Sequence, residues 1–377
     1  MTDLNGTIDA RFEPLAQILR GQLESGYDLG ASLAVAVDGQ IVTDCWGGWA
    51  DEAETEPWQS DTITNVWSTT KTMTALCALI LIDRGLLDPT EKVATYWPEF
   101  ADNGKADIEV RHIMSHTSGV SAWAQPVTVD DILDDDKATA MLAGQAPWWE
   151  PGTASGYHAL NQGHLVGEVV RRIDGRGLKQ FFAEEVADPL GADFTIGAPA
   201  SERGRISNVI PPPPLPMPDE IDLESVMIKT FTGPAPEASI SHTAAWRDAT
   251  IGAANGHGNA RSVATIQAAV SNGGRVGDTQ LLSADTVARI FEQQSNGVDL
   301  VLGMPVSFGL GYALADPIDA IVSSGQVCYW GGWGGSIVVN DLDHRVTMAY
   351  MMNRMQAGLV GNDTSVALYA ALRSILD

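Results

Sequence analysis

The stretch Ser68-Thr69-Thr70-Lys71 opens the most strongly helical segment of the chain, residues 68–83, which Gly85 is placed to end. On a helix, an offset of three residues puts a serine hydroxyl and a lysine amine on one face, one turn apart. A free serine hydroxyl is a poor nucleophile, and a neutral amine at this distance can take its proton. Burial and the positive end of a helix both lower a lysine pKa. The residues that precede Ser68 include three candidate helix caps, Thr62, Thr64 and Asn65.

Taken alone, the four residues have an ordinary alternative, in which Ser68 caps a helix and Lys71 faces solvent. Two other stretches favour catalysis. Residues 151–157, Pro-Gly-Thr-Ala-Ser-Gly-Tyr, present a tyrosine from a turn just before a predicted helix. Residues 330–336, Trp-Gly-Gly-Trp-Gly-Gly-Ser, lead into a predicted strand, and their glycines allow a ligand to approach backbone N–H groups closely.

With these stretches the chain resembles the serine β-lactamase and penicillin-binding-protein superfamily, specifically the family VIII carboxylesterases that are similar to class C β-lactamases. The matching phrases occur in the family's order over residues 30–355, and that joint order is more specific than any one phrase. They are Ser68-Thr69-Thr70-Lys71, His116-Thr117-Ser118-Gly119, Pro151-Gly152-Thr153 with Tyr157, Phe308-Gly309-Leu310-Gly311-Tyr312, and Trp330-Gly331-Gly332.

The resemblance implies a role for each matching position. Ser68 would be the acylated nucleophile, Lys71 its base partner and Tyr157 the group that exchanges a proton with the leaving alcohol. The backbone N–H groups of Ser68 and Trp333 would form the oxyanion hole. Trp330, Gly331 and Gly332 would contact the substrate, because they stand where the penicillin-binding enzymes have Lys-Thr-Gly.

Two departures from the class C pattern bear on the substrate. Tyr157-His158-Ala159 replaces Tyr-x-Asn, so His158 either partly substitutes for the missing amide in substrate binding or faces solvent. Trp330 replaces the lysine whose ammonium pairs with the carboxylate of penicillins and of peptide C-termini. The absence of that charge favours neutral acyl esters over anionic β-lactams. Trp330 and Trp333 also suggest an aromatic pocket for the acyl or alcohol group.

The order of predicted elements indicates an α+β fold. We expect one antiparallel β-sheet flanked by N- and C-terminal helices, with a mainly helical region inserted, as in serine β-lactamases. The sheet domain would comprise residues 1–62 and 300–377, and the mainly helical domain residues 63–299. The expected helices are residues 8–23, 68–83, 109–115, 159–173, 178–186 and 364–375, and the expected strands are residues 31–37, 41–46, 308–313, 335–340 and 346–352.

The proline-rich run at residues 210–218 is predicted to be an extended surface segment packed on its own domain. A polyproline ligand for another protein is the alternative. The glycine-containing residues 252–256 are interpreted as a loop, since no strand precedes them as a dinucleotide site requires.

Charge, composition and residue spacing argue against several classes of partner and site. The net charge of −26 and the isoelectric point near 4.4 disfavour nucleic acid and anionic membrane surfaces. No apolar run reaches bilayer length and no signal peptide is visible, which predicts a cytoplasmic protein. Three widely spaced cysteines argue against a disulfide framework. The pair His112 and His116 lacks a His-Glu-x-x-His arrangement, so we expect no metal and no cofactor.

The sequence therefore predicts a carboxylesterase that cleaves small-molecule esters with small to medium acyl groups through an acyl-enzyme on Ser68. Three alternatives stay open: β-lactamase or D-Ala-D-Ala peptidase activity, acyl transfer to another alcohol or amine, and a non-catalytic binding protein of the same fold. The sequence does not specify the oligomeric state.

Overall fold

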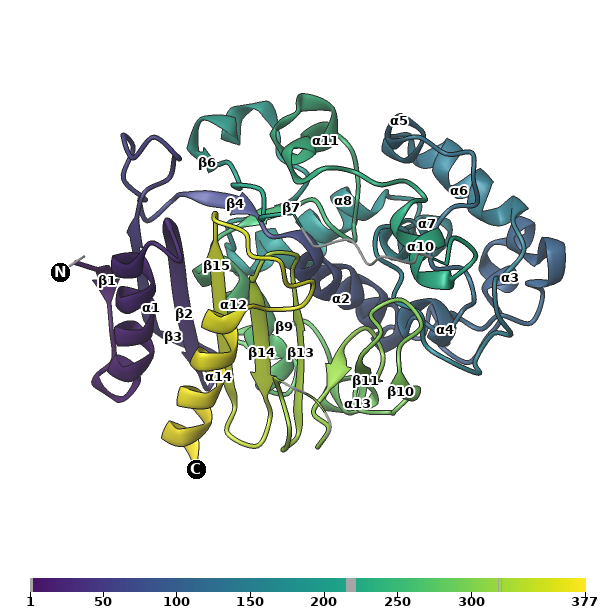
Figure 1. The fold of residues 1–377 in the computed structure, drawn as a ribbon. Helices are drawn as coiled ribbons and strands as arrows, with labels where there is room; N and C mark the ends of the chain where they lie inside the picture. Colours follow the sequence, from purple (N-terminus) through teal and green to yellow (C-terminus); the bar gives the residue numbers. More distant parts are fainter. Residues whose placement is uncertain (1–2, 215–221, 318, 320) are drawn as a thin grey trace.

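The computed structural model describes residues 3–214, 222–317, 319 and 321–377. Its main feature is a nine-stranded antiparallel sheet in the order β1-β3-β2-β15-β14-β13-β12-β11-β10 (Figure 1). The N-terminal hairpin therefore pairs directly with the last strand of the chain, Val35 lying opposite Met348. The strands are β1 (Asn5–Thr7), β2 (Gly30–Val37), β3 (Gln40–Gly48), β10 (Ser295–Val298), β11 (Pro305–Phe308), β12 (Ala313–Leu314), β13 (Val327–Gly331), β14 (Ile337–Asp341) and β15 (Val346–Met352).

Helices cover both faces of this sheet. Helices α1 (Glu13–Ser25) and α14 (Asp363–Leu376) lie together on one face, while α12 (Ala260–Ser271) packs against β2, β14 and β15 (Figure 1). The alternation of strand side chains separates the two faces. Leu33 and Val35 share a core cluster with α1 and α14, whereas Ala34 belongs to the cluster that contains α12. The central strands of the sheet, such as β14 and β15, are thus buried on both sides.

Helix α2 (Thr70–Asp83) runs through the centre of the molecule. Its residues 70–82 are all buried, the first turns with threonines and Lys71 and the rest with apolar side chains on every face. It packs against α7 (Gln162–Asp174), α8 (Leu178–Phe182) and α13 (Ala284–Arg289). The remaining α-helices are α3 (Val93–Tyr96), α4 (Val110–Met114), α5 (Val129–Leu133), α6 (Asp135–Gly144), α9 (Asp188–Leu190), α10 (Val226–Phe231) and α11 (Ala244–Asp248).

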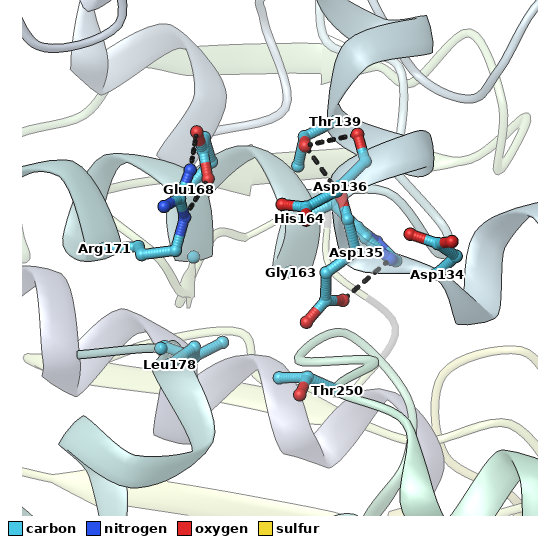
Figure 2. A pocket seen from close by; sticks show the side chains of 12 residues that line it. Asp134, Asp135, Asp136, Thr139, Gly163, His164, Glu168, Arg171, Leu178 and Thr250 are labelled. Carbon is cyan, nitrogen blue, oxygen red and sulfur yellow. Dashed lines mark hydrogen bonds and ion pairs between the residues drawn. The ribbon is translucent and has the colours of Figure 1, made fainter. Parts of the chain in front are cut away.

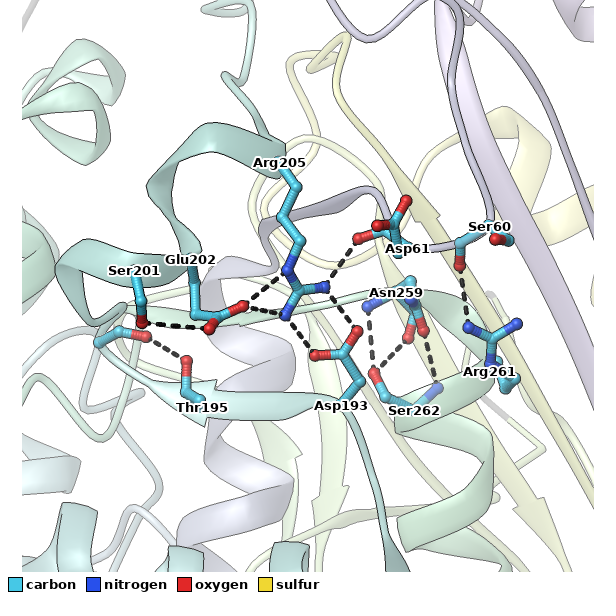
Figure 3. Close-up of polar contacts among 11 residues, drawn as sticks. Ser60, Asp61, Asp193, Thr195, Ser201, Glu202, Arg205, Asn259, Arg261 and Ser262 are labelled. Atoms are coloured by element: carbon cyan, nitrogen blue, oxygen red, sulfur yellow. Dashed lines mark hydrogen bonds and ion pairs between the residues drawn. The ribbon is translucent and has the colours of Figure 1, made fainter.

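A second, four-stranded sheet leads the chain into α2. Its order is β5-β7-β4-β6, formed by β5 (Phe194–Ile196), β7 (Gly256–Gly258), β4 (Ile63–Asn65) and β6 (Ile206–Ser207). Arg205 stabilises the edge of this four-stranded sheet through ion pairs with Asp193 at 2.6 Å and Glu202 at 2.7 Å (Figure 3). Arg205 also donates to the Asp61 carbonyl at 2.7 Å. These contacts fix the start of β4, the strand that precedes Ser68. A separate two-stranded ribbon joins β8 (Arg275–Val276) and β9 (Thr279–Gln280).

The predicted α+β class is confirmed, and two local expectations are wrong. The strand expected at residues 308–313 ends at Phe308 and restarts at Ala313, because a turn intervenes in which the N–H of Gly309 donates to the Tyr312 carbonyl at 2.9 Å. None of the three candidate caps acts on α2. Thr62 accepts from the Gln59 N–H, Thr64 donates to the Ser207 carbonyl, and Asn65 donates to the Ala254 carbonyl.

The division of the chain into a sheet domain and a mainly helical domain stays a prediction. Helix α12 and strand β10 both fall within residues 63–299, the range expected to be mainly helical, yet both pack with the nine-stranded sheet. The sheet region and the helical region therefore interleave there. In the proline run, only residues 210–214 are described, and Ile210 pairs with Arg354 next to the end of β15. Residues 215–218 of that run lie outside the described residues.

The three cysteines, Cys45, Cys77 and Cys328, are buried and free. Among the helices that the structure describes, none combines the length and the apolar character needed to cross a membrane.

Candidate active site

Ser68 lies in a short turn between β4 and α2. The turn is a 3-10 helix, Trp67–Thr69, and Trp67 adopts the left-handed backbone conformation with φ of +49°. A tryptophan is uncommon in this region, and backbone strain of this kind gathers at functional sites. The side chain of Ser68 is buried but retains some exposure, with 8% of the residue accessible.

Lys71 contacts Ser68 from inside the protein. Its Nζ lies 3.1 Å from Ser68 Oγ, 2.7 Å from the Ala159 carbonyl oxygen and 2.9 Å from the Ala253 carbonyl oxygen. Burial away from water lowers the pKa of Lys71 well below its ordinary value. A neutral amine has two hydrogens and one lone pair. In that form the two carbonyls can take the hydrogens, which leaves the lone pair for the Ser68 hydroxyl.

Tyr157 contacts Ser68 from the other side. Its hydroxyl donates to Ser68 Oγ at 2.6 Å and accepts from Trp330 Nε1 at 3.3 Å. Burial raises the pKa of Tyr157, while the hydrogen bonds with Ser68 and Trp330 lower it and the negative charge of Asp299 raises it. The phenol is therefore protonated at neutral pH. The structure thus brings Ser68, Lys71, Tyr157 and Trp330 together, although they come from three separate parts of the sequence.

Asp299 is a site residue that the sequence analysis missed. It is fully buried, and its Oδ1 accepts from the N–H groups of Tyr157 at 3.0 Å, Val301 at 2.9 Å and Leu302 at 2.9 Å. One carboxylate oxygen therefore joins the turn at residues 299–302 to the backbone of the tyrosine. Because 142 residues separate Asp299 from Tyr157, no local pattern could have found it.

His116, which the sequence analysis named in a family phrase and weighed as a metal ligand, also packs at this site. Its ring packs edge-on against Tyr157 and Phe308, with centroids 5.0 and 4.8 Å apart, and lies 6.2 Å from Trp330. Its Nδ1 accepts from the backbone N–H of His158 at 3.1 Å. Burial lowers the pKa of His116 well below its ordinary value, so the ring is neutral. The His116-Thr117-Ser118-Gly119 phrase was a sequence signal, but its packing against Tyr157 could not be predicted.

His158 does not face solvent, and it is not free to bind substrate. The residue is fully buried, and its Nε2 and Nδ1 each lie 2.6 Å from an oxygen, Ser118 Oγ and the Gly156 carbonyl respectively. Burial lowers the pKa of His158 to about 3. In the neutral ring Nδ1 donates to the carbonyl and Nε2 accepts from Ser118. Both nitrogens are occupied, so His158 supports the turn before Tyr157.

The Trp-Gly-Gly stretch runs from the end of β13 past the Ser68 turn. A Cβ on Gly332 would stand only 2.4 Å from the Val66 carbonyl oxygen, so glycine permits this close approach. The Trp333 ring packs edge-on against Trp67, with centroids 5.0 Å apart. Within the described part of the chain, neither the Ser68 N–H nor the Trp333 N–H has a hydrogen-bond acceptor. Both donors are available to a ligand.

A separate acidic hollow lies between α6 and α7 (Figure 2). It is lined by Asp134, Asp135 and Asp136 and by Glu168, whose carboxylate pairs with Arg171 at 2.7 Å. No predicted site residue lines it. Asp134 caps α6 by accepting from the Lys137 N–H at 3.0 Å, and Asp135 and Asp136 lie in the first turn of that helix. Among the described residues, no group of three or more His, Cys, Asp or Glu side chains is arranged to hold a metal ion.

Comparison with known proteins places this site in a family. The sequence model described as "Beta-lactamase" matches residues 15–371. The esterase/β-lactamase LipL of Mycobacterium tuberculosis is 34% identical over 98% of this chain and 87% of its own length. A family VIII carboxylesterase of known structure is 37% identical, with a TM-score of 0.93 over 99% of this chain and all of that one.

A penicillin-binding-protein homologue from Caulobacter crescentus is similarly close in structure, with 34% identity and a TM-score of 0.94 over the full length of both chains. EstA from Arthrobacter nitroguajacolicus Rue61a is 28% identical, with a TM-score of 0.87 over all of this chain and 98% of that one. Because the family model and these relatives extend over nearly the whole chain, the protein belongs to the β-lactamase family, on the branch of the family VIII carboxylesterases.

Proposed function

We propose that the protein is a carboxylesterase in which Ser68 attacks a neutral ester and carries the acyl group until water removes it. The observation that carries this proposal is the convergence of Lys71 Nζ and the Tyr157 hydroxyl on Ser68 Oγ, at 3.1 and 2.6 Å. The esterase names of similar proteins, LipL and the family VIII carboxylesterase, support the same chemistry.

In the acylation step, the lone pair of neutral Lys71 accepts the Ser68 proton as Oγ bonds to the ester carbonyl carbon. The negative charge that develops on the carbonyl oxygen is stabilised by the N–H groups of Ser68 and Trp333. When the bond to the alcohol breaks, the alkoxide takes the Tyr157 proton and the Lys71 ammonium returns one to Tyr157. The lysine is neutral again, and the alcohol leaves.

Deacylation runs this sequence in reverse, with water in place of the alcohol. As the water oxygen bonds to the acyl carbon, Tyr157 takes the water proton and passes its own proton to Lys71. The Lys71 ammonium then gives a proton to Ser68 Oγ as the bond between Oγ and the acyl carbon breaks, which releases the carboxylic acid and restores the neutral lysine. No cofactor is required by these steps. Acyl transfer to a second alcohol would use the same residues, and nucleophile competition distinguishes it from hydrolysis.

The proposed substrates are small-molecule esters with small to medium acyl groups. Trp330 is buried and uncharged, and its indole N–H is directed to Tyr157. It offers no cation to the carboxylate of a β-lactam or of a peptide terminus. We therefore expect ester turnover to exceed β-lactam turnover. Cytoplasmic location and the exclusion of nucleic-acid and membrane partners stay predictions from the sequence.

The test combines labelling and turnover. A fluorophosphonate probe should add its mass to the peptide that contains Ser68, and Ser68→Ala should abolish both this label and the hydrolysis of p-nitrophenyl acetate. Ser271→Ala is the matched control, since Ser271 is a buried serine of α12 whose hydroxyl contacts Thr347. Labelling that persists in Ser68→Ala would reject the assignment. Nitrocefin turnover faster than ester turnover would favour the β-lactamase alternative.

A further inference from the structure

A hollow of about 440 Å³ opens beside Trp333. Prolines line it, together with Trp333, whose backbone N–H belongs to the proposed oxyanion hole. Among the described residues that line it, Glu237 alone is charged. The lining residues are Pro211, Pro212, Pro213, Pro214, Glu237, Ala238, Ser239, Trp333 and Ala357.

The proline wall is held in place at its start. The N–H of Ile210 donates to the Asn353 carbonyl at 2.7 Å, and the N–H of Met355 donates to the Ile210 carbonyl at 3.0 Å. These bonds anchor the segment to the chain that follows β15. Each following proline has a fixed φ, so the wall has little conformational freedom to lose when a ligand binds.

The other walls are tied to the same framework. His242, at the end of the 3-10 helix Ala238–His242, has its Nε2 2.8 Å from the Val209 carbonyl oxygen, next to the proline wall. On the Ala357 side, the N–H of Gln356 donates to the Gly334 carbonyl and the N–H of Gly334 donates to the Gly358 carbonyl, both at 2.9 Å. The hollow therefore exists before a ligand arrives.

Trp333 connects this hollow to the reacting centre, and the ring contacts indicate which end of an ester it faces. Tyr157, which serves the leaving alcohol, packs against His116 and Trp330. Trp333 packs instead against Trp67, the residue before Ser68. An ester held with its alcohol oxygen at Tyr157 therefore directs its acyl group toward Trp333.

We infer that the hollow between the proline run and Trp333 is the acyl pocket, which binds uncharged, apolar acyl chains. This inference rests on the proposed esterase function and gives it a substrate class. Apolar walls favour burial of methylene groups. Glu237 at the pocket repels a carboxylate, so acyl groups that end in an acid are excluded, which agrees with the absence of a cation at position 330.

The test fills the pocket at two of its lining positions, with Ala357→Trp and Ser239→Trp. Turnover is measured along two series: p-nitrophenyl esters from acetate to octanoate, and acetate esters of alcohols from methanol to naphthol. In each filled variant, the ratio of kcat/KM for octanoate to that for acetate should fall at least about tenfold. The preference along the alcohol series should not change. Ala140→Trp, at an exposed position of α6, is the matched control and should change neither series.

The outcomes separate the two proposals. If the wild-type protein hydrolyses no ester in either series, the esterase function fails and the pocket inference fails with it. If the wild type is active but both filled variants keep the wild-type acyl preference, the esterase stands and the pocket inference is wrong. A change confined to the alcohol series also overturns it, because the hollow would then bind the leaving group. If one filled variant does not fold by circular dichroism, the other filled variant decides the outcome.

Discussion

At the scale of single residues, the central question is how a lysine acts as a base at neutral pH. Lys71 meets two carbonyl oxygens and a hydroxyl, and burial lowers its pKa. The carbonyls of Ala159 and Ala253 orient the amine, and neither removes its lone pair. Burial favours the neutral amine, and the two carbonyls direct it to Ser68, which is what proton abstraction requires.

Replacing Lys71 with arginine tests this role. Arginine is not deprotonated in proteins, so the variant has no lone pair to offer. We expect kcat/KM for p-nitrophenyl acetate to fall by about 10²–10⁴-fold. In the wild type, kcat/KM should fall as the pH decreases through the lowered pKa of Lys71, because the protonated amine cannot accept the Ser68 proton. The residual activity of Lys71→Arg should lack this acid limb.

Lys105 provides the control for this experiment. It is also fully buried, and its amine also donates to carbonyl oxygens, those of Asp102 at 2.7 Å and Ala143 at 2.9 Å. Lys105→Arg makes the same chemical change away from Ser68, so the kcat of the folded fraction should match the wild type. Equal losses in the two variants would mean that the effect comes from burying an arginine, and Lys71 would lose its assignment as base.

At the scale of elements, the site depends on how closely α7 approaches the loop that carries Ala253. A Cβ on Gly163 would stand 2.4 Å from the Ala253 nitrogen and 2.5 Å from the Gly252 carbonyl carbon. Backbone atoms at that distance cannot yield without moving the loop. The glycine on α7 therefore sets the position of a carbonyl that Lys71 requires, although Gly163 itself touches no reacting atom.

We expect Gly163→Ala to lower the stability by about 1–3 kcal/mol through overpacking. It should also lower kcat/KM at least about tenfold, since the Ala253 carbonyl shifts relative to Lys71. Thermal unfolding and ester turnover measure the two effects.

Gly21→Ala is the matched change in α1, where a Cβ would meet nothing within 4 Å. It should raise the stability by about 0.5–1 kcal/mol and leave turnover unchanged. Wild-type activity in Gly163→Ala would show that the loop position does not matter for the lysine.

The elements also show where sequence reasoning succeeds. Hydrophobic periodicity located α14 and β15, and the short spacing of Ser68 and Lys71 predicted a contact that the structure places at 3.1 Å. Sequence reasoning failed where the contact that determines the local structure joins residues that are distant in the sequence. The turn that interrupts residues 308–313 puts Gly311 against Ala75, since a Cβ on Gly311 would stand 2.4 Å from the Ala75 Cβ. A segment of alternating character gives no sign of that neighbour.

The same limit applies to the caps and to Asp299. Thr64 and Asn65 have capping side chains, but the neighbouring strand and loop provide partners at positions 207 and 254, and these contacts outweigh a local cap. Asp299 binds the backbone of Tyr157 through a contact that only the folded chain creates. Local propensity and spacing can nominate reacting groups, whereas the residues that position them depend on tertiary structure.

At the scale of the whole molecule, the dominant property is charge. The chain has 48 acidic and 22 basic side chains, so 48 − 22 leaves an excess of 26 negative charges. Many of the basic side chains are already paired, as Arg176 is with Asp174, Glu184 and Glu185. Exposed pairs contribute little, typically about 0–1 kcal/mol each. The acidic side chains in excess repel one another in the compact state, and this repulsion opposes folding.

Salt should therefore stabilise this protein. At an ionic strength of about 0.1 M the screening length is about 10 Å, shorter than most separations across the surface, so long-range repulsion is reduced more than close pairing. We expect the Tm at pH 7 to rise by several degrees between about 0.01 and 0.3 M sodium chloride. Sucrose at equal osmolarity controls for effects other than screening. A Tm that falls with sodium chloride would mean that the surface ion pairs outweigh the repulsion, and the stability of the fold would then depend on pairs such as those of Arg176 and Arg205.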